Sequence, residues 1–139
     1  MANPKILVVE DDSVVAADIQ NRLKVLGYAT GATSGKEAIK KAAESRPDLV
    51  LIGAELKGEV DSARAAEHIH NHLDIPVIYV TGHSRDEASA RSKATESFDR
   101  VRVLNPSEER ELLTAIEKAL YKHKMGKVRS YLRTMDWDA

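Results

Sequence analysis

The feature that most constrains the fold is an alternation of short aliphatic runs with segments of helical periodicity. The strongest runs are ILVV at 6–9, LVLI at 49–52 and VIYV at 77–80, and weaker strand patterns lie at 28–32 and 101–104. Continuous aliphatic runs are typical of strands buried on both faces. After each run, apolar residues or helix-start signals predict a helix, beginning near residues 13, 34, 61, 84 and 107. This pattern predicts a doubly wound α/β sandwich with a parallel sheet.

Length and composition narrow the class of protein. The chain has 139 residues, which suits one domain with a single core. Its 21 Lys and Arg nearly balance 22 Asp and Glu, so net charge gives no reason to expect a nucleic acid or membrane partner. The absence of cysteine excludes disulfides and thiolate metal sites. With no signal-peptide pattern and no long apolar run, the sequence predicts a cytoplasmic protein.

Polar residues follow the strands at the edge where such folds bind ligands. Ligands of doubly wound sheets sit outside the carboxyl ends of the strands. Glu10 and Asp11 follow the first strand, Gly53 the third, Thr81 the fourth and Asn105 the fifth. We therefore expect the functional site among these residues.

Four segments around these residues resemble one known family over about residues 4–124. ILVVEDD, PDLVLIG, IPVIYVTGHS and VLNPSEEREL are similar in order and spacing to the receiver domain of two-component response regulators. The resemblance implies a flavodoxin-like fold, a three-layer sandwich of five helices around a five-stranded parallel sheet in the order 2-1-3-4-5. It also implies a phosphorylation switch. In that family an Asp after the third strand accepts a phosphoryl group from a histidine kinase, with Mg²⁺ held by an acidic pair after the first strand.

Part of the family's site is present in this chain. The resemblance matches Glu10 and Asp11 to the acidic pair and Thr81 to the hydroxyl residue that bonds the phosphate. Arg102 stands where the family often has an aromatic residue that moves with phosphorylation. Since Mg²⁺ needs only one or two carboxylates plus water, Glu10 and Asp11, with Glu55 nearby, would form a weak Mg²⁺ site. No other cofactor is expected.

Two positions of the family's site are altered. Gly53 stands where the family has its phospho-accepting Asp, and Asn105 stands where it has a Lys that pairs with the phosphate. An acyl phosphate requires a carboxylate nucleophile, which glycine lacks. Loss of an Asp and a Lys together leaves the local charge balance unchanged, which is typical of a natural pseudo-receiver. We therefore expect a non-enzymatic domain that signals by protein contact without normal aspartyl phosphorylation.

Other functions stay open beside this interpretation. Glu55, two residues beyond Gly53, points to the same side if the strand continues, so it is an atypical candidate acceptor. A second alternative is a module that binds a small ligand or metal in the emptied pocket beside Gly53, Thr81 and Asn105. The expected partners are a histidine kinase or other two-component proteins, with no nucleic acid and no membrane.

Two further patterns lie outside the family's motifs. His68, His70 and His72 suggest either a metal site or the solvated flank of a helix, and the second interpretation is favoured. The chain divides into a receiver domain at 1–124 and an extension or connector of helical periodicity at 125–139. From residue 118 to 134 it is basic without acids, and Val128, Tyr131, Leu132 and Met135 recur at helical spacing. This tail either docks a partner or simply continues the last helix into solvent.

Overall fold

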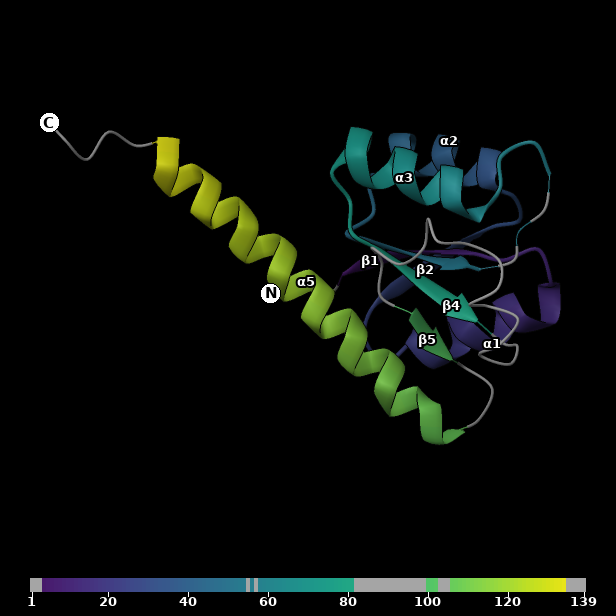
Figure 1. Cartoon of the computed structure of the whole chain (residues 1–139). Coiled ribbons are helices and arrows are strands. Elements are labelled where there is room, and N and C mark those ends of the chain that lie inside the picture. The colour runs from purple at the N-terminus through teal and green to yellow at the C-terminus, as the bar shows by residue number, and fades with distance from the viewer. Residues whose placement is uncertain (1–3, 55, 57, 82–99, 103–105, 135–139) are drawn as a thin grey trace, which may run out of the picture.

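A computed structural model describes residues 4–54, 56, 58–81, 100–102 and 106–134, with a few side chains, including those of Thr81 and Arg102, left out. A parallel sheet forms the centre of the protein, with strand order β2-β1-β3-β4-β5 (Figure 1). Its strands are β1 (Lys5–Val9), β2 (Tyr28–Ala32), β3 (Leu49–Gly53), β4 (Val77–Thr81) and β5 (Arg100–Arg102). The α/β class and the strand order are those that the sequence and its resemblance predict.

Helices cover both faces of the sheet. Those described are α1 (Ser13–Leu23), α2 (Gly35–Ser45), α3 (Ser62–Leu73) and α5 (Pro106–Thr134). The pair α2 and α3 lies on one face, and α1 and α5 lie on the other (Figure 1). The helix expected at about residues 84–97 lies outside the described residues, so the full set of five helices stays a prediction.

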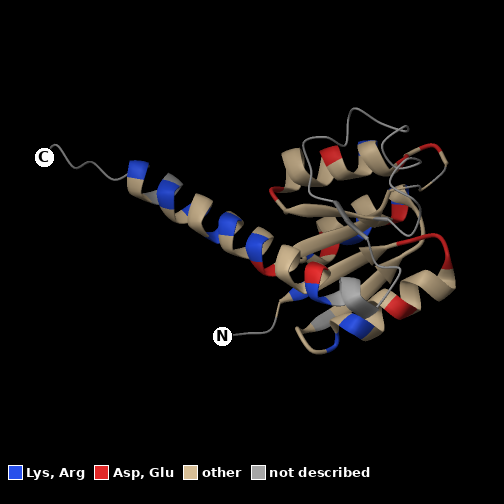
Figure 2. Ribbon diagram, turned by 60° about the horizontal axis from the view of Figure 1, so that its bottom comes forward, with Lys and Arg blue, Asp and Glu red and all other residues tan. Residues whose placement is uncertain are grey.

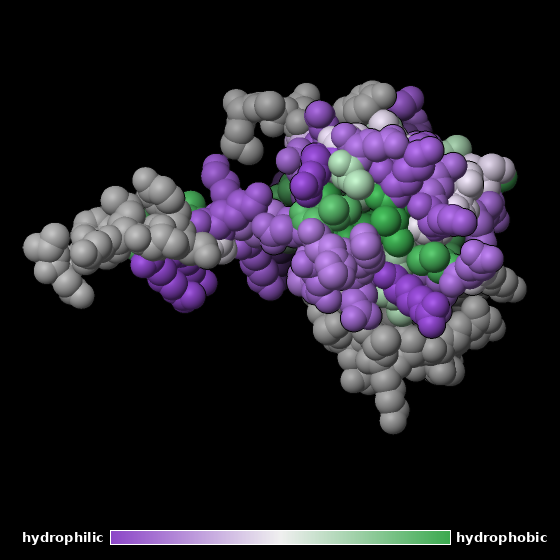
Figure 3. All heavy atoms as spheres, turned by 90° about the horizontal axis from the view of Figure 1, so that it is seen from above, coloured by the Kyte–Doolittle hydropathy of each residue, from purple (hydrophilic) through white to green (hydrophobic). Residues whose placement is uncertain are grey.

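The core consists of two layers, one on each side of the sheet. Alternate side chains of β1 enter opposite layers: Leu7 and Val9 pack toward α2 and α3, whereas Ile6 and Val8 pack toward α1 and α5. Every residue of β3 is buried. This burial on both faces explains why the central strands are continuous aliphatic runs and not alternating ones. Seen from the side of α2 and α3, the outer surface is mostly hydrophilic and apolar side chains show between hydrophilic ones (Figure 3).

Side-chain caps fix the starts of the helices that follow the strands. Asp12 Oδ1 accepts hydrogen bonds from Val14 N at 2.9 Å and Val15 N at 3.3 Å, which caps α1. Ser34 Oγ accepts from Glu37 N at 3.1 Å, as the capping-box pattern predicts. The Glu37 carboxylate, however, accepts from Thr33 N, one residue before the cap.

The last helix extends well beyond the body of the protein. Leu112 and Ile116 are fully buried against the sheet, and Leu120 packs at the edge of that layer. Beyond Leu120, no α5 residue whose side chain is described is buried. The remaining turns project away from the body, as Figure 1 shows. No helix in the described part of the chain is both long and apolar enough to cross a membrane.

Candidate functional site

The carboxyl ends of β1 and β3 bring Glu10 against Gly53. The two strands are neighbours, with Val9 opposite Ile52, so the residues that follow these lie side by side. A Cβ atom built on Gly53 would overlap Oε2 of Glu10, and it would lie 3.2 Å from Glu10 Cδ and 3.4 Å from the Val9 carbonyl oxygen. The Glu10 carboxyl group therefore occupies the space that a side chain at position 53 would need.

This placement changes the acid–base behaviour of Glu10. The pKa of Glu10 is raised from its ordinary value of 4.5 to about 7, mainly because burial disfavours the charged form. A hydrogen bond with the Asp11 side chain and the negative charges of Asp11 and Asp12 raise this pKa further. The Asp12 backbone N–H, which donates to Glu10 Oε1 at 3.2 Å, partly offsets the increase. Near neutral pH, Glu10 is thus divided between its protonated and ionised forms.

The three acidic residues after β1 have different surroundings. Asp12 caps the start of α1. Asp11 is exposed and adjoins the half-buried Glu10. Two adjacent carboxyl groups suit a dication held largely by water, because a positive charge would relieve the unfavourable interaction between them. Among the described residues, no three metal-ligating side chains form a closed set. The chemistry of these two donors therefore fits weak Mg²⁺ binding.

A buried serine that the sequence analysis missed fixes the loop after Gly53. Ser62 is only 3% exposed, and its hydroxyl donates to the Gly53 carbonyl oxygen. The same hydroxyl accepts from Leu56 N at 2.9 Å. Asp61, not Ser62, caps α3: its side chain accepts a hydrogen bond from Arg64 N at 2.9 Å. The Ser62 hydroxyl therefore bonds to the loop after β3 and not to the first turn of the helix. A serine at a helix start is typical of a cap, so no local sequence pattern indicates this second role.

The remaining predicted site residues are only partly described. Thr81 and Arg102 are paired residues of β4 and β5, and their backbones lie at the same edge of the sheet as Glu10. Their side chains, and all of Glu55 and Asn105, lie outside the described part. The structure thus brings together Glu10, Asp11 and Gly53, and leaves the roles of the others as predictions.

At the opposite end of the sheet, a cleft of about 560 Å³ lies between α5 and the loops that precede β3 and β4. His123 of α5 lines it, with Nε2 3.4 Å from Asp74 Oδ1. Asp48 also lines this cleft, and its carboxylate accepts from Lys5 N at 2.7 Å. Asp48 therefore lies far from Gly53, at the other end of β3.

The histidines of α3 form no metal site with other described residues. Ile69 is buried, whereas the three histidines are exposed, as expected for a solvated flank. The rings of His68 and His72 contact each other with their centroids 4.8 Å apart and their planes tilted by 40°. His70 instead pairs with the Asn71 side chain at 3.0 Å.

Comparison with known proteins identifies the fold and the family. The signal receiver domain of a modulated diguanylate cyclase from Desulfovibrio desulfuricans G20 has a similar structure, with a TM-score of 0.76 and 29% sequence identity. That match covers 89% of this chain and 98% of the other. Among curated proteins, the transcriptional regulatory protein PrrA of Mycobacterium tuberculosis is 30% identical over 90 residues, which cover 60% of this chain and 36% of PrrA.

A longer alignment is made with a probable transcriptional regulator, ycf27, of Guillardia theta. It is 24% identical over 133 residues, which cover 94% of this chain and 50% of ycf27. The chain thus spans half or less of the length of these two curated relatives. The family model of the response regulator receiver domain matches residues 6–128. The chain, with its parallel sheet and its acidic residues after β1, therefore belongs to the response regulator receiver domain family.

Proposed function

We propose that this chain is a pseudo-receiver, which signals by contact with other proteins and is not phosphorylated at the usual strand end. The observation that carries the proposal is the Glu10 carboxyl group lying over Gly53, where a phospho-accepting side chain would be. Position 53 has no carboxylate to form an acyl phosphate. The space that an incoming phosphoryl group would enter is also taken by a partly ionised acid, which would repel it.

The residue at position 105 supports the same conclusion. Receiver domains place a Lys there, and its charge pairs with the phosphate once it is formed. Asn105 provides no positive charge. Since phosphoryl transfer depends on positioning and charge stabilisation, the chain lacks both the nucleophile and one of the stabilising cations. Weak Mg²⁺ binding at Glu10 and Asp11 would supply charge there, but it would not supply a nucleophile.

Two alternatives are weighed against this function. Phosphorylation of Glu55 would need the longer carboxylate to reach an in-line position two residues from Gly53, which positional catalysis disfavours. A small-ligand or metal module would use space beside Gly53, and the end of the Glu10 side chain lies there, so a ligand would first have to displace it. The pseudo-receiver function therefore agrees best with the described residues.

Proteins of two-component pathways are the proposed partners, including a histidine kinase or the target of one. The surface that we propose for contact includes β5 and α5, where Arg102 replaces the family's aromatic residue. Two of the relatives are named as transcriptional regulators, but the match covers half or less of each. The expected absence of nucleic acid and membrane partners, and the cytoplasmic location, stay predictions.

Beryllofluoride with Mg²⁺, which mimics an aspartyl phosphate, tests this function. NMR spectra would be recorded during titration of the wild-type protein, Gly53→Asp, and Gly53→Asp combined with Asn105→Lys. We expect no saturable shift of the Thr81 amide in the wild type, a weak response in the single variant and a stronger one in the double variant. A saturable Thr81 shift in the wild type would contradict the proposal. An equal response of both variants would refute the role assigned to position 105.

A further inference from the structure

The projecting half of α5 carries an apolar stripe that the body of the protein does not cover. Tyr121 is 66% exposed, Val128 40% and Leu132 44%, which makes them three of the five large apolar residues exposed in the described part. Together with the half-buried Met125, they are spaced four, three and four residues apart. This is the heptad spacing of a coiled-coil seam.

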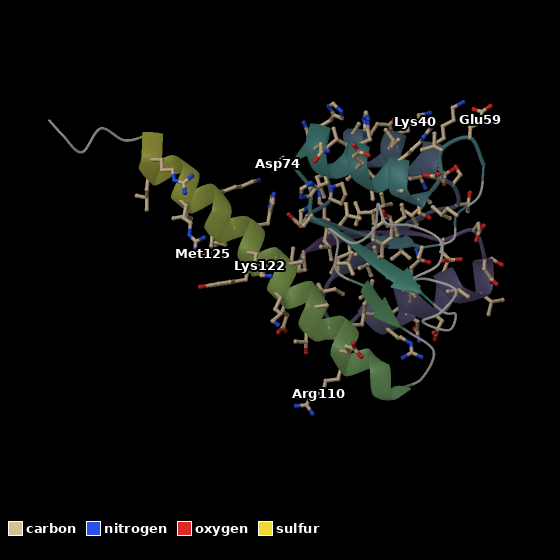
Figure 4. The ribbon with its side chains drawn as sticks, in the orientation of Figure 1. Lys40, Glu59, Asp74, Arg110, Lys122 and Met125 are labelled. Atoms are coloured by element: carbon tan, nitrogen blue, oxygen red, sulfur yellow. The ribbon has the colours of Figure 1, made fainter. Side chains whose placement is uncertain are left out.

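The stripe is on the side of α5 away from the sheet. At about 100° per residue, its four members fall within about 60° of the helix surface, roughly opposite the row of Leu112, Ile116 and Leu120 that packs on the body. Figure 4 shows Met125 on the side of the helix away from Asp74 and the α/β body. The apolar stripe therefore has no role in the core of this domain.

Basic side chains flank the stripe on both sides. From residue 118 to 134 the helix has six Lys and Arg and no acidic residue. Figure 2 shows these cations along the projecting turns. Lys122 and Arg129 border one edge of the stripe, and Lys124 borders the other. In a coiled coil, such flanking positions determine which partner is accepted.

This charge pattern disfavours a second copy of the chain. In a parallel pair, Lys124 would face Arg129 of the second copy, and in an antiparallel pair like charges would again meet. The pattern also disfavours a lipid surface, since membrane-surface helices bury a broad apolar face and this stripe is only about 60° wide. A partner helix with a narrow apolar seam and acidic residues on both sides of it would match the width of this stripe and the positive charge of its flanks.

We propose that the α5 extension, residues 118–134, is a docking surface for an acidic amphipathic helix of another protein. The apolar seam of that helix would pack along Tyr121, Met125, Val128 and Leu132, and its carboxylates would pair with the flanking cations. This inference goes beyond the proposed function and does not depend on whether the chain is phosphorylated.

The test uses two synthetic helical peptides with the same leucine and isoleucine seam. One peptide has Glu at the flanking positions and the other has Lys. Fluorescence anisotropy with the full chain is expected to show binding of the Glu peptide that weakens as salt is raised, and no binding of the Lys peptide. NMR shifts are expected at residues 118–134 and not at Glu10 or Gly53, which separates this result from the test of phosphorylation.

Variants on the helix identify the surface that binds. Leu132→Asp, and separately Lys122→Glu with Arg129→Glu, are expected to weaken binding of the Glu peptide at least about tenfold, which corresponds to about 1.4 kcal/mol. Val25→Asp is the matched control, because Val25 is 78% exposed and lies outside α5. It is expected to bind like the wild type. Unchanged circular dichroism and melting temperature would show that the variants remain folded.

Three results would overturn the proposal. The first is that the folded chain binds neither peptide, or binds both equally. The second is a stable dimer of the chain alone that Leu132→Asp dissociates, which would assign the stripe to a second copy. The third is binding to phosphatidylglycerol vesicles that Leu132→Asp abolishes while the Glu peptide does not compete, which would assign the stripe to a lipid surface.

Discussion

Replacing Glu10 with Gln tests the geometry of the site through its effect on stability. The pKa of Glu10 is about 7 in the folded protein, against an ordinary value of 4.5. Between these values the folded state binds the proton more tightly than the unfolded state does. The contribution of Glu10 to the free energy of unfolding is therefore fully present below the lower pKa and is lost as the pH rises through the higher one.

The size of this loss follows from the two pKa values. At about 1.4 kcal/mol per pKa unit, the difference between the two values sets an upper limit of about 3.5 kcal/mol. Because the Glu10 side chain is only half-buried, screening by water reduces the expected loss to about 1 to 2 kcal/mol. The Gln variant keeps the acceptor for the Asp12 N–H and does not ionise. At about pH 8 it should be more stable than the wild type by this amount, and near pH 4.5 the advantage should disappear.

Urea unfolding of the wild type and of Glu10→Gln across this pH range measures the difference. Contributions of groups that do not interact with Glu10 cancel in the comparison, so the difference reports Glu10 and its neighbours Asp11 and Asp12. Glu59→Gln is the matched control, because the Glu59 side chain is 89% exposed and lies 4.0 Å from Lys36. The raised pKa of Glu10 in the folded protein would be wrong if the Glu10→Gln variant were less stable than the wild type at about pH 8, or if its advantage in stability did not change with pH.

Three further substitutions test separate parts of the structure. Ser62→Ala should lower the free energy of unfolding, measured with urea, by about 2 kcal/mol, because the Gly53 carbonyl and the Leu56 N–H lose their partner. Ser45→Ala, at an exposed helix end, is the control and should lower it by less than about 0.5 kcal/mol. A Cβ at Gly126 meets no atom within 4 Å, so Gly126→Ala should stabilise the α5 extension by about 0.5 to 1 kcal/mol and slow its amide exchange; unchanged exchange would mean that the helix does not form there in solution. Gly53→Ala should displace the Glu10 carboxyl group toward water. Carbon NMR titration should then show a pKa of Glu10 that is lower in this variant than in the wild type. An unchanged pKa would contradict the contact between Glu10 and Gly53.

Much of the fold could be predicted because its causes lie in local sequence. Aliphatic strands buried on both faces leave uninterrupted runs, and β1 and β3 are described at nearly the predicted residues. The contact between Glu10 and Gly53 could not be predicted, because it depends on how a side chain from one strand end turns across its neighbour. Ser62 was missed for a related reason: its role requires a carbonyl and an N–H that only the folded loop brings to one hydroxyl.

The apolar stripe on α5 was only partly anticipated from the sequence. The periodic residues were Val128, Tyr131, Leu132 and Met135, but the side chain of Tyr131 and all of Met135 lie outside the described residues. Tyr121 and Met125 join the stripe because they lie on the side of α5 away from the row of Leu112, Ile116 and Leu120 that packs on the body. Where the body ends is a property of the packed sheet and helices, which periodicity alone does not reveal.

The intact mass of the wild-type chain after incubation with acetyl phosphate and Mg²⁺ shows whether the chain can accept a phosphoryl group. We expect no phosphoryl adduct, because position 53 has no nucleophile and the Glu10 carboxyl group lies where its side chain would be. The double variant Gly53→Asp with Asn105→Lys, treated in parallel, is the positive control: a phosphoryl adduct on it shows that the donor is active. A stoichiometric adduct on the wild type that hydroxylamine removes would show that the chain is phosphorylated and is not a pseudo-receiver. Loss of this adduct in Glu55→Gln would identify Glu55 as the acceptor.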